Sequence, residues 1–410
     1  MSEWREHKLG DFIEVKHGFA FSGTGITDQP TRNILVTPGN FNIGGGFKNS
    51  KFKYFNYEFP NEYILKTGDI VVTMTDLSQE TDTLGYAAKI PMYDGINFLH
   101  NQRIGLVQFK GSEANEDFIY WLMRTKEYQS FIVGSASGTS IMHTSPSRIK
   151  EYQFLLPSRS EQAAIAEVLS SLDDKIDLLH RQNKTLEQLA ETLFRQWFVE
   201  EAEESWEVAK LGDVAVIQNG YAFSSKDYVE SVNDHLEVLK MGHIERGGGL
   251  RSNPKRDFVP RDESLQRWIL NKNDIVMAMT DMKDNVVILG VPAMIDKSNH
   301  YVLNQRVARI YLKSKEKLIN EYLLYVQLKN TEFIGNLQSK ANSGVQVNLS
   351  TDAIKNSDII IPPITLQKEV GGSIEDLYLK KESNDLQIRT LTQLRDTLLP
   401  KLMSGEVRVR

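Results

Sequence analysis

The sequence predicts an α+β protein with two copies of a strand-rich mixed domain, each followed by a long helix. Three observations lead to this fold class. Short motifs recur in one order about two hundred residues apart, each copy contains short apolar runs between turn residues, and two long stretches carry heptad spacing. A length of 410 residues exceeds one typical core and suits two domains with additional helices.

The two copies are recognised by motifs that keep their order and nearly their spacing. Because chance does not reproduce several motifs at one offset, the chain contains an internal duplication. The matched segments are residues 8–11 and 210–213 (both KLGD), 18–22 and 220–224 (GFAFS, GYAFS), 68–76 and 273–281 (GDIVVTMTD, NDIVMAMTD), 101–104 and 304–307 (NQRI, NQRV), 137–138 and 343–344 (both SG), and 155–157 and 360–362 (LLP, IIP).

Each copy begins with strand-like segments and contains one helical segment. Short apolar runs predict buried strands at residues 70–74, 104–107, 275–279 and 307–311. Helices are expected around residues 116–128 and 319–329, and glycine triplets at 44–46 and 247–249 mark turns at matching places. We expect the first domain at residues 1–157 and the second at 200–362.

Two long helices follow these domains, at residues 158–199 and 363–410. Residues 161–198 contain no glycine or proline, and Ser158 or Ser160 can cap their start. Helices of nearly forty residues span about 55 Å. The coiled-coil seam of the central helix is Leu172, Ile176, Leu179, Asn183, Leu186, Ala190, Leu193 and Trp197. The C-terminal seam is Leu377, Asn384, Ile388, Leu391, Leu398 and Leu402, interrupted by Lys381 and Arg395.

Two such helices in one chain can pair and close the repeat around a pseudo-two-fold axis. Two domains held apart by a rigid rod can bind sites one to two turns of B-DNA apart, since the major groove returns to one face about every 34 Å. Because the domains have diverged, the two half-sites should differ, provided that the ligand is DNA.

Composition excludes several classes of protein. The chain has no cysteine, which excludes disulfides and cysteine-ligated zinc and fits a cytoplasmic location. It has no run of about 18 apolar residues and no signal-peptide pattern at its N-terminus. The net charge of −6 argues mildly against nucleic-acid binding, but a global count can hide local basic patches.

Local basic and polar segments are the candidate DNA-binding residues. Basic side chains among aromatic ones suit phosphate, base-edge and stacking contacts, and amide side chains suit adenine. The alternatives are a solvated surface for the basic residues and plain turn chemistry for the polar loops. The candidates are Lys48, Lys51, Lys53, Thr139, Ser140, His143, Arg246, Arg251, Lys255, Arg256, Gln346 and Asn348, with Phe47, Phe52, Tyr54 and Phe55 between the first lysines.

Three further features each allow two interpretations. The apolar cluster of Leu193, Phe194, Trp197 and Phe198 is either core or a docking surface for a partner. Asn183 either fixes the register of the coiled coil or is a tolerated polar residue. The repeated NQR segments at 101–103 and 304–306 either bond the backbone or contact a ligand.

An enzymatic function has little support. The sequence lacks Walker A, G-x-G-x-x-G, H-E-x-x-H and G-x-S-x-G motifs, and its histidines do not cluster at metal-ligand spacing. His143 and His243 are expected at the surface. Asp76 and Asp281 end matching strands without catalytic partners, and Asp173 lies on the proposed coiled coil, where carboxylates are normally solvated. We therefore expect no catalytic, cofactor or metal site on this chain.

The order of domain, helix, domain, helix resembles the specificity subunits of type I restriction–modification enzymes. The resemblance covers essentially the whole chain and rests on the doubled KLGD openings after Trp4 and Trp206, the strand at 68–71, the NQR segments, and the LLP and IIP segments that lead into the helices.

The resemblance implies two target recognition domains that each recognise one half of a split, asymmetric DNA site. It implies that the helices form an antiparallel coiled coil that sets the gap between the half-sites. It also implies two modification subunits that bind S-adenosylmethionine, and restriction subunits that use ATP and Mg²⁺, as partners of a non-catalytic chain.

The alternative is a coiled-coil scaffold whose domains bind proteins and not DNA. Phosphate contacts release counterions, so a strong salt dependence of DNA binding distinguishes the two hypotheses.

Overall fold

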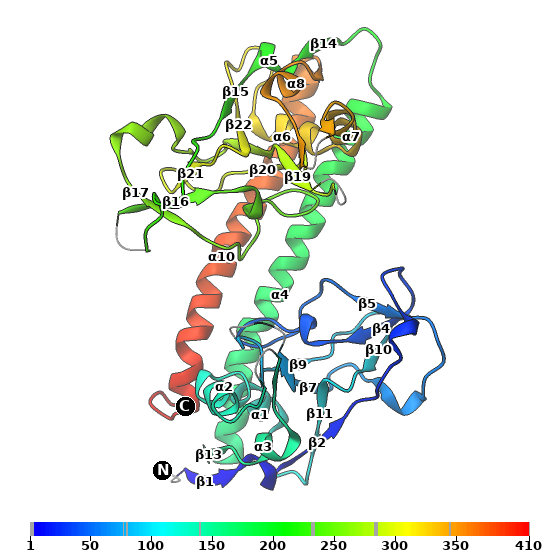
Figure 1. Cartoon of the computed structure of the whole chain (residues 1–410), viewed down its shortest axis with the longest axis vertical. Coiled ribbons are helices and arrows are strands. Elements are labelled where there is room, and N and C mark those ends of the chain that lie inside the picture. Colours follow the sequence, from blue (N-terminus) through cyan, green and yellow to red (C-terminus); the bar gives the residue numbers. More distant parts are fainter. Residues whose placement is uncertain are drawn as a thin grey trace. The chain divides into compact units, whose positions relative to one another are not determined.

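The computed structural model describes residues 4–76, 78, 81–138, 141–230, 234–282, 286–343 and 346–409. It contains two compact units, Met1–Asp177 with Ile388–Arg410, and Leu178–Gln387. Two long helices, α4 (Arg159–Arg195) and α10 (Gly372–Met403), each contribute to both units (Figure 1). The predicted boundaries treated these helices as separate segments, whereas here each unit includes a part of both.

The first unit is built on two larger sheets. An antiparallel sheet has the order β2 (Ile13–His17), β11 (Ile104–Phe109), β7 (Ile70–Thr73) and β9 (Ala87–Lys89). All four side chains of β7 are buried, as its continuous apolar sequence predicts. The second sheet has the order β3 (Ile26–Thr27), β5 (Lys53–Phe55), β4 (Asn33–Val36), β10 (Asn97–His100) and β6 (Ile64–Leu65), with β4 and β10 parallel. Two short pairs are β1 (Arg5–Lys8) with β13 (Gln153–Leu156), and β8 (Thr75–Asp76) with β12 (Met142–His143).

The helix expected at residues 116–128 is divided in two. Helix α1 (Glu116–Leu122) is capped by the side chain of Asn115, and α2 (Lys126–Gly134) by that of Thr125. The Thr125 hydroxyl donates to the carbonyl of Leu122 and accepts from the backbone of Tyr128, so one residue ends the first helix and starts the second. A short helix, α3 (Pro146–Lys150), follows.

The second unit repeats this frame. Its antiparallel sheet has the order β15 (Ala215–Asn219), β22 (Val307–Leu312), β18 (Ile275–Ala278) and β20 (Pro292–Met294). The other strands are β14 (Glu207–Lys210) with β25 (Asp358–Ile361), β17 (Phe258–Pro260) with β16 (His235–Leu239) and β21 (Tyr301–Leu303), and β19 (Thr280–Met282) with β24 (Gln346–Asn348) and β23 (Asn342–Ser343). The helices are α5 (Leu211–Val214), α6 (Glu321–Lys329), α7 (Thr331–Ser339), α8 (Thr351–Lys355) and α9 (Ile364–Leu366).

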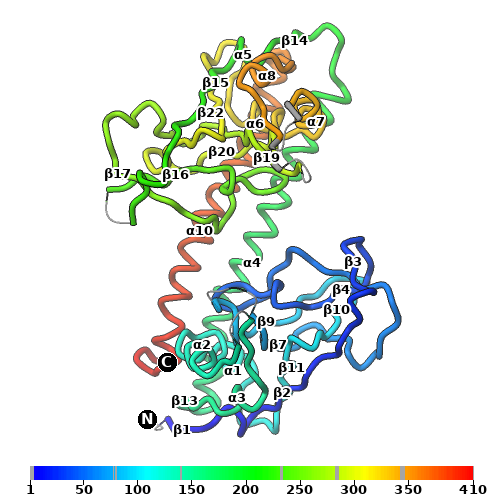
Figure 2. Tube along the Cα trace, viewed as in Figure 1, coloured from blue at the N-terminus to red at the C-terminus, as the bar shows by residue number. Residues whose placement is uncertain are grey.

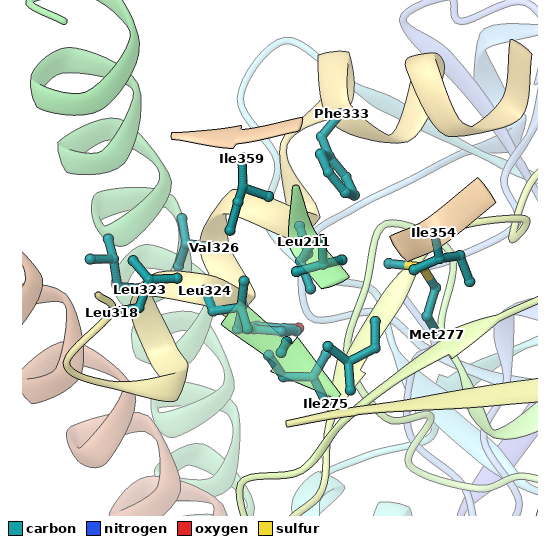
Figure 3. Close-up of a cluster of buried hydrophobic side chains, with 14 of the residues drawn as sticks. Leu211, Ile275, Met277, Leu318, Leu323, Leu324, Val326, Phe333, Ile354 and Ile359 are labelled. Carbon is teal, nitrogen blue, oxygen red and sulfur yellow. The ribbon is translucent and has the colours of Figure 1, made fainter. Parts of the chain in front are cut away.

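The core of each unit lies between its antiparallel sheet and its helices. In the second unit, Leu211, Ile275 and Met277 pack against side chains of α6 and α8 (Figure 3). The end of α4 and the π-helical turn Gln196–Glu200 that follows it belong to the same core, because Ala190, Phe194 and Phe198 are buried in it. In the first unit, Leu399, Leu402 and Met403 from the end of α10 join the corresponding core. Figure 2 traces the chain through both copies.

Within each unit, α4 and α10 contact one another. In the second unit, Asn183 bonds to Asn384 and Asp385, and Glu187 pairs with Lys381. As residue numbers increase along α4, the numbers of the residues that they contact on α10 decrease. The helices are therefore antiparallel, as expected. The two cations that interrupt the C-terminal seam are both paired with acids of α4: Lys381 with Glu187, and Arg395 with Asp173 in the first unit.

The fold class is confirmed: two mixed domains repeat one strand order, and each is followed by a long helix. Among the described residues, no helix combines the length and apolar character needed to cross a membrane.

Candidate nucleic-acid interface

The basic residues predicted to bind DNA lie next to the glycine turns, on exposed loops except for Lys53, which begins β5. Lys48 and Arg251 occupy equivalent places, because their backbone N–H groups donate to the carbonyls of Asn40 and His243 at 2.7 Å each. Both side chains are exposed, as are those of Lys51, Lys53, Arg246, Lys255 and Arg256. The structure thus presents one cationic loop in each domain.

These cations differ in whether they have acidic partners. Lys53 pairs with Asp28 at 2.6 Å, Arg251 with Glu245 at 3.4 Å and Arg256 with Glu237 at 3.6 Å. Among the residues that the structure describes, four of the predicted cations have no ion pair: Lys48, Lys51, Arg246 and Lys255. Unpaired exposed cations are those best able to bind phosphate, since no bond within the protein must first be broken.

A second pair of equivalent candidates is His143 and Asn348. Both are exposed and lie on strands that pair with the end of a buried strand: His143 lies opposite Thr75, and Asn348 opposite Thr280. The threonine hydroxyl contacts His143 Nδ1 at 3.2 Å and Asn348 Oδ1 at 3.1 Å. Of the neighbouring candidates, Thr139 and Ser140 lie outside the described residues, and Gln346 pairs through its backbone with Met282.

The buried aspartates at the ends of these strands hold the adjoining loops. Asp76 accepts bonds from the backbone N–H of Ser78 and from the N–H and hydroxyl of Thr83, at 2.7 to 2.8 Å. Asp281 accepts from the backbone N–H groups of residues 287 to 289. Burial raises the pKa of Asp76, but these hydrogen bonds outweigh burial and lower that pKa. Both carboxylates have a structural role.

The comparisons with known proteins bear directly on this doubled arrangement. A family model described as the type I restriction modification DNA specificity domain matches residues 1–188 and 203–392. The chain belongs to this family.

Relatives and a solved structure match over most of the chain. The MjaVIII specificity subunit of Methanocaldococcus jannaschii is 25% identical over 100% of this chain and 94% of its own length. The MjaIX specificity subunit from the same organism is 26% identical over 72% of this chain and 69% of its own length. The type I restriction–modification S subunit from M. genitalium has the same fold, with a TM-score of 0.55, 18% identity, and coverage of 98% of this chain and 96% of that one.

The aromatic residues expected to stack on bases pack in or against the core of the first specificity domain. Phe47 and Phe52 pack edge-on against Phe98, and Phe55 packs against Phe21. Phe55 is 2% exposed. The interpretation of Phe55 as a stacking group was wrong, because its ring is covered by the core. Phe47, Phe52 and Tyr54 are half-buried, so the interpretation stays a prediction for them.

His243 is not at the surface of the second specificity domain, as was expected, but is 2% exposed. Its Nδ1 accepts from the backbone of Lys240, so its Nε2 carries a proton and donates to Glu237 at 3.0 Å. His300 Nε2 contacts the other carboxylate oxygen at 3.2 Å. Burial raises the pKa of Glu237, but the bonds from both histidines and the charge of Arg256 outweigh burial and lower it to about 2. This cluster ties β16, the central strand of its sheet, to the turn that precedes the basic loop.

The apolar cluster at the end of α4 has two parts. Phe194 and Phe198 are 3% and 0% exposed and lie in the core of the second specificity domain, with Leu193 packed against it. Their predicted role as partner-binding residues was wrong, because a buried side chain cannot contact another subunit. Trp197 is 36% exposed and Leu193 is half-buried, so the partner-binding prediction stays with these two residues.

Two basic residues that sequence reasoning missed connect the glycine turns to α4. Arg124 donates to the carbonyls of Gly44 and Gly45 and pairs with Asp173 at 2.8 Å. The side-chain carbons of Lys329 in the second specificity domain lie against Gly248, and its Nζ pairs with Glu191 at 2.7 Å. A sequence signal existed: Tyr120 and Tyr325 each stand four residues before a cation at matching places. These contacts position each basic loop on its domain.

Proposed function

We propose that each of the two domains binds one half of a split, asymmetric site in double-stranded DNA, which is how this chain supplies sequence specificity to a type I restriction–modification system. One observation carries the proposal. A single frame is presented twice with different exposed polar residues at equivalent places: Lys48 and Arg251 in the basic loops, and His143 and Asn348 beside the buried strands. Identical frames with different contact residues suit two half-sites of different sequence.

We further propose that the chain holds two modification subunits, and that restriction subunits join the same complex. Apolar side chains left exposed on α4 and α10 within the second unit support a protein-binding role: Leu178, Leu189, Leu379 and Leu386 are 39%, 46%, 44% and 60% exposed. In this proposal the chain itself is non-catalytic and acts in the cytoplasm. S-adenosylmethionine, ATP and Mg²⁺ bind to the partner subunits.

The test is methylome sequencing of a host that expresses this chain with its modification subunits, compared with a host that lacks the chain. We expect a new split motif with adenine methylation in both halves. If no motif appears while the same modification subunits are active with another specificity subunit, the proposal fails and a protein-binding scaffold becomes the better hypothesis.

A further inference from the structure

The repeated NQR segments form the same rigid turn in both domains. In the first domain the Asn101 side chain accepts from the backbone N–H of Arg103 at 2.9 Å, and the N–H of Gln102 donates to the carbonyl of Phe19 at 2.9 Å. In the second domain Asn304 and Arg306 form the first contact at 3.2 Å, and Gln305 and Tyr221 form the second at 2.9 Å. The asparagine side chain therefore has a structural role in each turn, and together with the backbone bonds it shapes the turn.

Each turn lies in close contact with the glycine that begins the repeated GFAFS or GYAFS motif, Gly18 in the first domain and Gly220 in the second. A Cβ on Gly18 would lie 2.2 Å from the carbonyl oxygen of Asn101, and one on Gly220 would lie 2.2 Å from the same group of Asn304. The backbone at positions 18 and 220 can come this close to the turn only because glycine has no Cβ. The GFAFS and GYAFS motifs thus hold the two turns in place.

The turns lie beside the hairpins that carry the candidate DNA-binding residues. The N–H of Met74 donates to the carbonyl of Arg103, and its carbonyl accepts from Thr144, which follows His143. Met279 makes the same two bonds, with Arg306 and with Leu349, which follows Asn348. One residue in each domain therefore connects the turn with the hairpin.

The glutamine and arginine side chains of these turns have no evident role within the protein. Gln102, Arg103, Gln305 and Arg306 are all exposed. Neither arginine has an ion pair in the described parts of the chain. The repeated carboxylate of Asp76, two residues after Met74, is occupied by Ser78 and Thr83. By contrast, the buried Arg124 and the half-buried Arg309 are each paired with an aspartate.

Because the same glutamine and arginine occur in both domains, we expect them to contact a chemical group that both half-sites share. The bases of the half-sites differ, but the phosphates are the same. Arginine suits phosphate because its planar guanidinium can donate two parallel hydrogen bonds, and glutamine can donate through its amide. Phosphate contacts fix the position of a protein on the duplex and carry no sequence information.

We propose that Gln102–Arg103 and Gln305–Arg306 are a matched pair of DNA-backbone contacts, one in each domain, that bind phosphate irrespective of sequence and align the neighbouring hairpin with the bases. This inference rests on the proposed DNA-binding function and adds a class of contact to it.

The test compares Arg103→Ala and Arg306→Ala, alone and together, in the complex with modification subunits. Affinity is measured at several salt concentrations for a duplex with the methylated motif and for an unrelated duplex. We expect each substitution to weaken binding to both duplexes about tenfold. We expect each to reduce the slope of log K against log salt concentration by about 0.9. The methylated motif should not change.

Arg32→Ala is the matched control. Arg32 is exposed and has no ion pair among the described residues, but it precedes β4, whereas the turn follows β10, which runs parallel to β4. It therefore lies at the opposite end of the same sheet, and its loss should leave the salt slope unchanged. Arg103→Lys should retain the slope, because the charge remains, while losing part of the affinity.

Three results separate failure of this inference from failure of the proposed function. An altered motif in Arg103→Ala would mean that this residue contacts bases, which overturns the inference. An unchanged salt slope in the double variant, with normal unfolding temperature, also overturns it. If the unsubstituted complex binds DNA without salt dependence, the DNA-binding function itself fails.

Discussion

At the scale of single residues, two positions accept only glycine because another segment of the backbone lies too close to leave room for a Cβ. Gly18 and Gly220 lie against the turns that begin at Asn101 and Asn304, and a Cβ at either glycine would overlap backbone atoms. Backbone cannot move aside as a flexible side chain can. The repeated glycines therefore encode a contact between segments about eighty residues apart, which no local pattern predicts.

Gly18→Ala should destabilise the first domain by about 1–3 kcal/mol, the usual cost of forcing an additional carbon into a packed site. Thermal unfolding of the purified complex measures this cost. Gly23→Ala is the control, because a Cβ there meets nothing within 4 Å, and its unfolding temperature should match that of the unsubstituted protein. Equal unfolding temperatures for both variants would contradict the close approach.

Glu237 should make stability depend on pH between about 4.5 and 2. Its pKa is lowered from 4.5 to about 2 in the folded state, so its contribution is present above pH 4.5 and is lost as pH falls through 2. The contribution is on the order of 2 kcal/mol. In urea titrations, the difference between the native chain and Glu237→Gln should be largest near neutral pH and shrink below pH 4.5. A difference independent of pH would show that the charge of Glu237 is unimportant.

At the scale of elements, a carboxylate of α4 joins three parts of the first unit. Asp173 pairs with Arg124, whose side chain is 4% exposed, and with Arg395 of α10. Burial raises the pKa of Asp173, but the two guanidinium charges outweigh burial and lower that pKa. Because Arg124 also holds the glycine turn, this carboxylate links the basic loop to both helices.

Asp173→Asn should lower the free energy of unfolding by about 3 kcal/mol, because it leaves a buried arginine without its counter-charge. Asp174→Asn is the matched control on the next residue, which is exposed, and should change stability by less than about 0.5 kcal/mol. Both are measured by thermal unfolding. A similar stability for the two variants would mean that solvent screens the Asp173 pair.

The seam between α4 and α10 contains one buried amide pair. Asn384 donates to Asn183 at 2.9 Å, and Asn183 donates to Asp385 at 2.7 Å. Asn183 and Asn384 are 6% and 1% exposed. Asn384 is therefore the residue with which Asn183 can fix the register of the two helices. The two amides can bond to each other in one register only, because the rest of the seam is largely apolar.

Asn183→Leu alone should destabilise the protein by about 2 kcal/mol, because it leaves the Asn384 amide buried without its partner. The double variant Asn183→Leu, Asn384→Leu should recover this loss or exceed the original stability, since an apolar seam is then complete. A double-mutant cycle in urea measures the coupling. If the losses of stability in the two single variants simply add up in the double variant, Asn183 and Asn384 do not stabilise the protein as a pair.

At the scale of the whole molecule, the duplicated chain gives each unit its own complete core. The end of α10 packs in the core of the first unit through Leu399, Leu402 and Met403. The end of α4 and the turn after it pack in the core of the second unit through Phe194 and Phe198. Each core therefore requires residues from distant parts of the sequence.

Exchanging the second domain, residues 207–361, for that of another specificity subunit should change one half of the methylated motif and leave the other half intact. The physical reason is that each domain carries its own sheets, basic loop and hairpin. Methylome sequencing checks the result. The reciprocal exchange of residues 5–156 is the control and should change the other half. A change in both halves from either exchange would contradict independent half-site recognition.

Local patterns in the sequence determined much of this protein. The duplication, the buried strands β7, β11, β18 and β22, and the two long helices follow from motif spacing, apolar runs and heptads. These signals suffice because they depend on residues a few positions apart. The basic loops were predicted in the same way, and their lysines and arginines are exposed as expected.

Only the tertiary structure decided which of the predicted residues are accessible. Phe55, Phe194 and Phe198 are core, and His243 is buried against Glu237. Arg124, between α1 and α2, reaches both a glycine turn and α4. Each of these outcomes depends on a contact between segments far apart in sequence. The burial of a side chain depends on which other segments pack over it. A periodic pattern within one segment does not show which segments these are.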